Sequence, residues 1–130
     1  MDKLNLIMNL IGWNNSPEDQ QRGIKLAEDF DNIEAFLQPG KPFGKSVWEN
    51  CAKILYKKTD SELLPYISQL LEWLQDLNWP GADIIYQRLL NFPEEKIIDK
   101  YLESLSIAKN NDRTWEEILI DFWKDFSKNH

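Results

Sequence analysis

A chain of 130 residues is long enough to form one hydrophobic core, and a formal net charge of −7 disfavours the phosphates of nucleic acid as a ligand. The single cysteine rules out an internal disulfide, and one cysteine with one histidine cannot supply the usual ligands of a zinc site. We therefore expect a single domain over residues 1–130 that is attracted to a basic partner rather than to nucleic acid.

Apolar residues recur at helical spacing along the chain, and no stretch shows the sustained alternation of a strand. The first apolar set predicts a helix near residues 2–11 and consists of Leu4, Ile7, Met8 and Ile11. This stretch is interrupted by Asn5 and Asn9, has no basic start, and is too short to span a bilayer. We expect a cytoplasmic protein that does not enter a membrane.

Four polar residues mark predicted helix starts: Ser16, Ser46, Asn78 and Thr114. Ser16 precedes Pro17 and two acids, a typical start signal, and Thr114 with Glu117 forms a predicted capping box. Asp31 is expected to cap a further short helix. Breaks between helices are predicted near residues 12–16, 38–45, 57–61, 78–80 and 110–114.

These four starts are spaced fairly evenly, which indicates a weak internal repeat. Each of the first three is followed by a helix, a brief break and a second apolar helix. The pattern predicts an all-α fold of about six to eight helices, either a HEAT-like α-solenoid or a right-handed stack of helical hairpins. An irregular bundle whose caps happen to be evenly spaced is the alternative.

The segment LLEWLQDLNWPGA, residues 70–82, predicts the end of one helix, a tight turn and the start of the next. Pro80 has no backbone N–H to donate and fits the first turn of a new helix. Both helices can pack on the two tryptophans that flank the break. The residues that we interpret as a structural signature are Trp73, Asp76, Asn78, Trp79 and Pro80.

This segment, with WENCAKIL upstream, resembles a family of small bacterial proteins known only as a domain of unknown function. The resemblance covers residues 16 to about 105 and implies a compact, HEAT-like helical domain without an assigned activity. Some small bacterial proteins of this type resemble immunity proteins that neutralise toxins. The family implies no catalytic residues, since the shared positions are those of packing and turns.

Two sets of residues could carry chemistry. Cys51 could be a nucleophile, but the only histidine, His130, is the last residue, and the apolar neighbours of Cys51 predict a buried small side chain. Glu72 and Asp76 share a helix face and Asp83 follows the turn, so the three carboxylates could hold magnesium or transfer protons. Alternatively, Asp76 accepts hydrogen bonds from the next helix and Glu72 is solvated.

The last predicted helix carries Glu117, Asp121 and Asp125 at successive i+4 positions, opposite its aromatic face. This acidic stripe is either a solvated surface or a docking site for a basic protein. We expect a non-enzymatic protein-interaction module without a cofactor, with immunity-type inhibition of a basic toxin as its concrete form. The alternative is a carboxylate-based metal-binding protein or enzyme that uses Glu72, Asp76 and Asp83.

Overall fold

The computed structural model describes residues 2–39 and 42–130, and this part of the chain contains helices and no strand. The α-helices are α1 (Lys3–Leu10), α2 (Pro17–Ala27), α3 (Trp48–Tyr56), α4 (Asp60–Leu63), α5 (Ile67–Glu72), α6 (Ala82–Leu90), α7 (Glu94–Asn111) and α8 (Arg113–Lys128). Short 3₁₀ helices are η1 (Ile33–Phe36), η2 (Lys45–Val47), η3 (Leu64–Tyr66) and η4 (Trp73–Gln75). The predicted all-α fold of about six to eight helices is confirmed for the described residues, whether or not the single turn α4 is counted as a helix.

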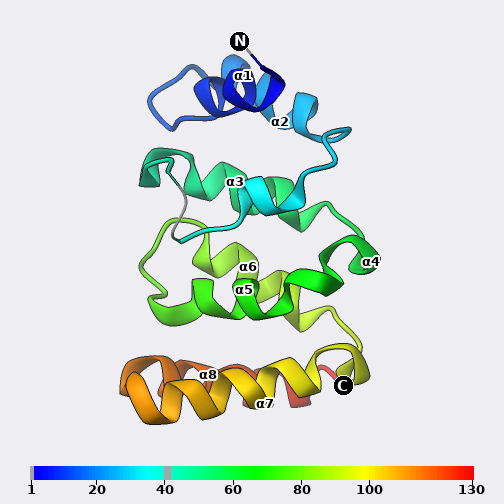
Figure 1. Cartoon of the computed structure of the whole chain (residues 1–130), viewed down its shortest axis with the longest axis vertical. Helices are drawn as coiled ribbons and strands as arrows, with labels where there is room; N and C mark the ends of the chain where they lie inside the picture. The colour runs from blue at the N-terminus through cyan, green and yellow to red at the C-terminus, as the bar shows by residue number, and fades with distance from the viewer. Residues whose placement is uncertain (1, 40–41) are drawn as a thin grey trace.

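The helices are arranged in layers along the long axis of the molecule, with α1 and α2 at one end and α7 and α8 at the other (Figure 1). Helix α3 with η1, and then α5 with α6, lie between these ends. The helices α2, α3, α6 and α8, here called the helix row, pack one on the next, and α5 packs on α7. No helix in the described ranges is long and apolar enough to cross a membrane.

The helix row repeats at a nearly even spacing, because its members begin at residues 17, 48, 82 and 113. Of the four predicted starts, only Ser16 is confirmed as a cap: its Oγ accepts a hydrogen bond from the backbone N–H of Asp19 at 3.1 Å. Ser46 lies inside η2, and α3 has no side-chain cap. The even spacing therefore reflects the stacking of the helices, while the residues that cap the helix starts differ from one helix to the next.

The predicted capping box at the start of α8 is wrong. Asp112 is the cap, accepting from the backbone N–H of Trp115 at 3.0 Å, and Thr114 lies inside the helix. A capping box occurs instead at the start of α4, where Thr59 and Glu62 bond reciprocally. The N–H and hydroxyl of Thr59 donate to the Glu62 carboxylate and lower its pKa below the usual value.

The short helix predicted after Asp31 is present as η1, but its cap is the next residue, Asn32, whose side chain accepts from the N–H of Ala35. Part of the loop predicted at residues 38–45 lies outside the described residues, namely positions 40 and 41. Each of the remaining predicted breaks contains a junction between helices, but the junctions within 57–61 and 110–114 are shorter than predicted, since α4 begins at Asp60 and only Asp112 separates α7 from α8.

The signature segment forms the turn between η4 and α6. The Trp73 side chain is fully buried, and its Nε1–H donates to the carbonyl of Pro80 at 3.1 Å. Asp76 Oδ1 accepts from the backbone N–H of Asn78 at 2.8 Å and so closes the turn. The predicted start of the next helix at Asn78 to Pro80 is wrong, because α6 begins at Ala82 and the residue before it is Gly81.

Gly81 is required at this joint for two reasons. Its φ of 84° lies in the left-handed region, which favours glycine. A Cβ on Gly81 would also lie 2.7 Å from the Cβ of Ala52, so the turn packs directly on α3. Trp79 is only half-buried, with its ring edge-on to that of Trp48 at 5.6 Å between centroids. The main aromatic anchor of the turn is therefore Trp73.

The layers from α1 to α6 are joined by buried polar side chains that donate to backbone carbonyls of the layer before. Asn50 Nδ2 donates to the carbonyl of Ile11 at 2.7 Å. Lys58 Nζ donates to the carbonyls of Ala27 and Glu28 at 3.1 and 3.0 Å, where α2 ends. Arg88 Nη2 in turn donates to the carbonyl of Lys58 at 2.9 Å. We call Asn50, Lys58 and Arg88 the polar joints.

Within the last layer, α7 and α8 are held together by aromatic rings, and the Nε1–H of Trp115 on α8 donates to the Leu71 carbonyl of α5 at 3.1 Å. Tyr101 of α7 stacks on Trp123 of α8 at 4.4 Å, and Trp123 stacks on Phe126 at 4.7 Å. Phe122 is fully buried beside them. The hydroxyl of Tyr101 donates to the carbonyl of Leu119 at 2.7 Å, so the aromatic cluster also satisfies its buried polar group.

Candidate functional site

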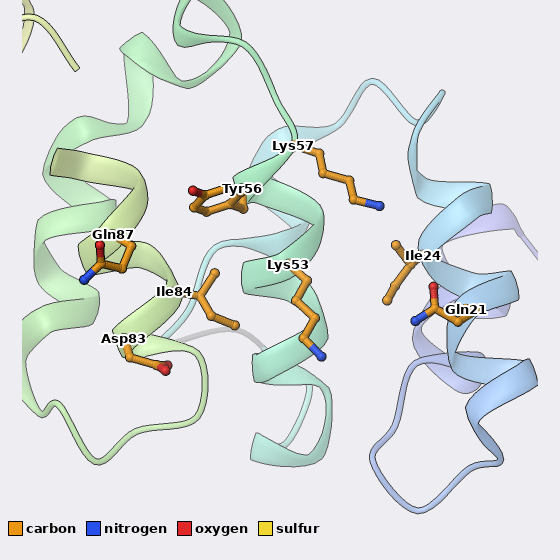
Figure 2. Close-up of a pocket in the computed structure, with 8 residues that line it drawn as sticks. All are labelled: Gln21, Ile24, Lys53, Tyr56, Lys57, Asp83, Ile84 and Gln87. Carbon is orange, nitrogen blue, oxygen red and sulfur yellow. The ribbon is translucent and has the colours of Figure 1, made fainter. Parts of the chain in front are cut away.

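An open groove crosses three members of the helix row, α2, α3 and α6 (Figure 2). Its volume is about 580 Å³, within the range of ligand-binding clefts. The side chains that line it are Gln21, Ile24, Lys53, Tyr56, Lys57, Asp83, Ile84 and Gln87. The groove therefore combines residues that lie far apart in the sequence.

Helical spacing explains why each helix contributes its own set. Residues 53 and 56 lie one turn apart on α3, residue 57 follows directly as its C-cap, and residues 83, 84 and 87 lie on one face of α6. Residues 21 and 24 are likewise one turn apart on α2. The layers then bring the three faces together, so that polar side chains surround a small apolar centre.

The apolar centre of the groove is formed by Ile84 and the ring of Tyr56, while Ile24 lies apart on the α2 side, beyond Lys53 and Lys57 (Figure 2). Ile24 is 4% exposed and belongs to the core, Ile84 is half-buried, and Tyr56 remains 42% exposed. A large exposed aromatic ring beside a partly covered aliphatic surface is typical of contact sites in protein interfaces. The sequence did not predict this groove, because Tyr56 and Ile84 each resemble an ordinary surface position and Ile24 resembles an ordinary core position.

Cys51 is not placed to act as a nucleophile. The side chain is fully buried, and burial raises the pKa of its thiol to about 12, with a smaller opposing effect from the neighbouring Gln38. His130 lies elsewhere, with its Nε2 at 3.0 Å from the carbonyl of Leu90 and its ring stacked on Phe126. The interpretation of Cys51 as a buried small side chain is confirmed.

The structure does not assemble Glu72, Asp76 and Asp83 into a metal site. No group of three or more His, Cys, Asp or Glu side chains within residues 2–39 and 42–130 is placed to hold a metal ion. Asp76 is engaged in its turn, Glu72 is exposed at the end of α5, and Asp83 lines the groove. The predicted alternative that Asp76 accepts from the next helix is also wrong, since Asn78 precedes α6.

The acidic stripe on α8 divides into two parts. Glu117 and Asp121 are exposed and lie near cations on their own helix, Arg113 at 3.4 Å and Lys124 at 3.9 Å. Asp125 is half-buried and accepts a hydrogen bond from the Tyr86 hydroxyl of α6. The third acid of the stripe therefore joins two layers, and only the first two are free to face a partner.

The hydroxyl of the half-buried Tyr86 lies beside the carboxylate of Asp125. Burial first, then the hydrogen bond to Asp125 and the charges of Asp125 and Asp121, raise the pKa of Tyr86 well above its usual value of 10.0. Asp83 is one turn away from Tyr86 on α6, so the acidic surface of α8 continues to the edge of the groove.

Residues 48–129 match the model of a family described as Domain of unknown function (DUF5071). The matched region begins later and ends nearer the C-terminus than the residues 16 to about 105 on which the sequence resemblance was based. It includes the α3 and α6 sides of the groove, while the α2 side precedes it. Neither a curated protein nor a solved structure matches the chain.

Proposed function

Because the chain belongs to the DUF5071 family, whose description assigns no activity, we propose its function from the groove: a non-enzymatic protein-interaction module that binds its partner across the helix row. The observation that carries this proposal is the open groove of about 580 Å³ with the exposed Tyr56 ring at its centre. An open surface formed by successive helices suits an extended partner better than a small molecule that must be enclosed.

We further propose that the layers form a HEAT-like solenoid. The proposal is supported by equivalent residues 30 positions apart: Ala52 and Leu55 of α3 correspond to Ala82 and Ile85 of α6, and Lys58, two residues after α3, corresponds to Arg88. Each pair combines similar side chains, and both members of every pair are buried. A repeat in which each layer contacts only its neighbours would leave one continuous row of helices as a binding face.

The partner that we propose is a basic protein, and immunity-type inhibition of a basic toxin is the concrete form. Support comes from the net charge of −7 and from the exposed carboxylates of Glu117 and Asp121 at one end of the helix row. Such charges would accelerate association more than they would strengthen the final complex.

The test begins with the isolation of proteins from the native organism that co-purify with the chain, identified by mass spectrometry. Binding of the recovered partner is then compared between Tyr56→Ala and a control, Leu102→Ala, which removes an exposed side chain from α7 outside the groove. We expect Tyr56→Ala to weaken binding about tenfold, as for an aromatic contact at an interface centre, and Leu102→Ala to leave it unchanged. Equal binding by both variants would contradict the proposal.

The basic character of the partner is tested separately by ionic strength. Replacing Glu117 and Asp121 with Gln and Asn should slow association at low salt and have little effect at high salt, because exposed charges are screened over about 8 Å at physiological ionic strength. An association rate that is insensitive to both changes would contradict a basic partner without contradicting an interaction at the groove.

A further inference from the structure

The two sides of the groove carry opposite charge. Lys53 and Lys57 extend from α3 toward α2, whereas Asp83 lies on the α6 side (Figure 2). The apolar centre lies between them. In a protein of net charge −7, two lysines at one side of a groove make a local exception to the overall electrostatic character.

Most polar groups of the groove have no partner within the described residues. The side chains of Gln21, Tyr56, Lys57, Asp83 and Gln87 make no hydrogen bond or ion pair there. Lys53 is the exception, at 3.6 Å from Glu49 on the same helix, and both of these side chains are about half exposed. These groups can therefore bond to another molecule without first breaking an internal contact.

The negative side continues along the helix row toward α8. A smaller hollow of about 200 Å³ adjoins the groove and shares Asp83 and Gln87 with it. Its other lining residues are Leu77, which is 45% exposed, and Tyr86, which bonds to Asp125. The surface thus changes from positive at α3 to negative at α6 and α8, with apolar side chains between.

We propose that the groove binds a partner segment in which one large apolar side chain lies between a carboxylate and a cationic group. The carboxylate faces Lys53 and Lys57, the apolar side chain packs on Tyr56 and Ile84, and the cation faces Asp83. This inference rests on the proposed interaction function and specifies the chemistry that the groove recognises. It is compatible with a partner that is basic overall, since only one local carboxylate is required.

The apolar contact should account for most of the affinity and the charges for most of the selectivity. Burial of an apolar side chain is favourable whatever the charge of its neighbours. An exposed ion pair changes affinity by no more than about fivefold. The charged group of the protein also disfavours a partner that carries a charge of the same sign at that position. The recognised segment is therefore best identified by comparing peptides that differ only in charge.

The probes are short synthetic peptides with a central phenylalanine and two charged residues on each side. The mixed peptide is Asp-Asp-Phe-Lys-Lys, and its controls are all-acidic, all-basic, and mixed with serine in place of phenylalanine. Binding is followed by amide chemical shifts of the isotopically labelled full-length protein. We expect the mixed peptide to bind most tightly, with shifts at Tyr56 and Ile84. If no peptide shifts these amides, or if the serine peptide binds equally well, the proposal is overturned.

Charge reversal in the protein gives the sharper test. Lys57→Glu should weaken the mixed peptide about fivefold and make the all-basic peptide the preferred one. Asp83→Lys should shift the preference to the all-acidic peptide. Lys96→Glu, an exposed reversal on α7 outside the groove, is the matched control and should change no preference. An unchanged peptide ranking in Lys57→Glu and Asp83→Lys would overturn the assignment of charges.

The experiments distinguish failure of the inferred charge pattern from failure of the proposed interaction function. If a natural partner depends on Tyr56 but its binding is unaffected by Lys57→Glu and Asp83→Lys, the groove is the binding site and the inferred charge pattern is wrong. If the natural partner is unaffected by Tyr56→Ala, the groove is not the binding site and the proposed function itself is wrong.

Discussion

Between α1 and α6, the polar joints donate hydrogen bonds from one layer to backbone carbonyls of the layer before. Within the last layer, α7 and α8 are held to each other by stacked aromatic rings, and Trp115 Nε1–H donates to the Leu71 carbonyl of the layer before. A hydrogen bond to a helix end depends on direction and distance, so it specifies how one layer sits on the next. Ring packing buries more apolar surface and depends less on direction. The first region is therefore specified mainly by orientation, and the last is stabilised mainly by burial.

The largest effect is expected from the aromatic layer. Phe122→Ala removes a fully buried ring that contacts Tyr86, Tyr101 and Phe126, so we expect a loss of about 3–5 kcal/mol in the free energy of unfolding. Denaturant melts followed by circular dichroism measure it. Leu102→Ala, which truncates an exposed side chain of α7, is the control and should cost far less. Similar costs for both variants would contradict burial as the main contribution.

Removing a polar joint should lower the free energy of unfolding less than removing a buried ring, and its effect should be confined to the neighbouring helix. Lys58→Met keeps the length of the side chain, leaves the Glu28 carbonyl without the Lys58 donor, and leaves the Ala27 carbonyl with only the backbone N–H of Phe30. We expect a loss of about 1–3 kcal/mol in the free energy of unfolding. Hydrogen exchange should be faster in α2 and unchanged in α8, as measured by mass spectrometry of peptic fragments. Uniformly faster exchange would indicate that the joint does not act locally.

Each of the two regions contains a buried group that loses its proton at alkaline pH, so the pH dependence of stability can be measured for each region. Burial raises the pKa of Cys51 from its usual 9.0 to about 12 and the pKa of Tyr101 from 10.0 to about 12. Because the folded state favours the neutral forms, their stabilisation is complete below the unfolded pKa values and is lost as pH rises above them. Stability should therefore fall from about pH 9 upward.

Variants assign the loss to each region. Cys51→Ala should flatten the fall that begins near pH 9, and Tyr101→Phe should flatten the part above pH 10, because burial raises the pKa of Tyr101 to about 12. The slope of the unfolding free energy against pH is compared, so that any constant cost of either substitution cancels. A slope that neither variant changes would show that other groups dominate the alkaline transition.

The smallest effects are expected on the acidic stripe. Asp125→Asn weakens the acceptor for Tyr86 and should cost about 0.5–1.5 kcal/mol in the free energy of unfolding. Glu117→Gln, on the exposed part of the same stripe, should change it by less than about 0.5 kcal/mol. Thermal melts of the two variants side by side are sufficient. A larger cost for Glu117→Gln would reverse the division of the stripe into a structural and a free part.

Several features could be predicted from the sequence because they depend on neighbours in the chain. Apolar residues at helical spacing identified the core faces of α3 and α8, and these faces are buried or half-buried in the structure. Ser16 was identified as a cap because Pro17 after it fixes where the helix begins. The prediction was wrong where several polar residues stood close together, as at Asp112 and Thr114.

The sequence by itself thus determined the fold class, the core-facing positions and the turn around Trp73, since each follows from spacing over a few residues. Only the tertiary structure decided which positions form the groove, because Ile24, Tyr56 and Ile84 line one surface through the stacking of three separate helices. It also decided the role of Asp125, whose partner Tyr86 lies 39 positions away. Periodicity within a helix shows which face is buried, but contacts between helices depend on how the layers pack.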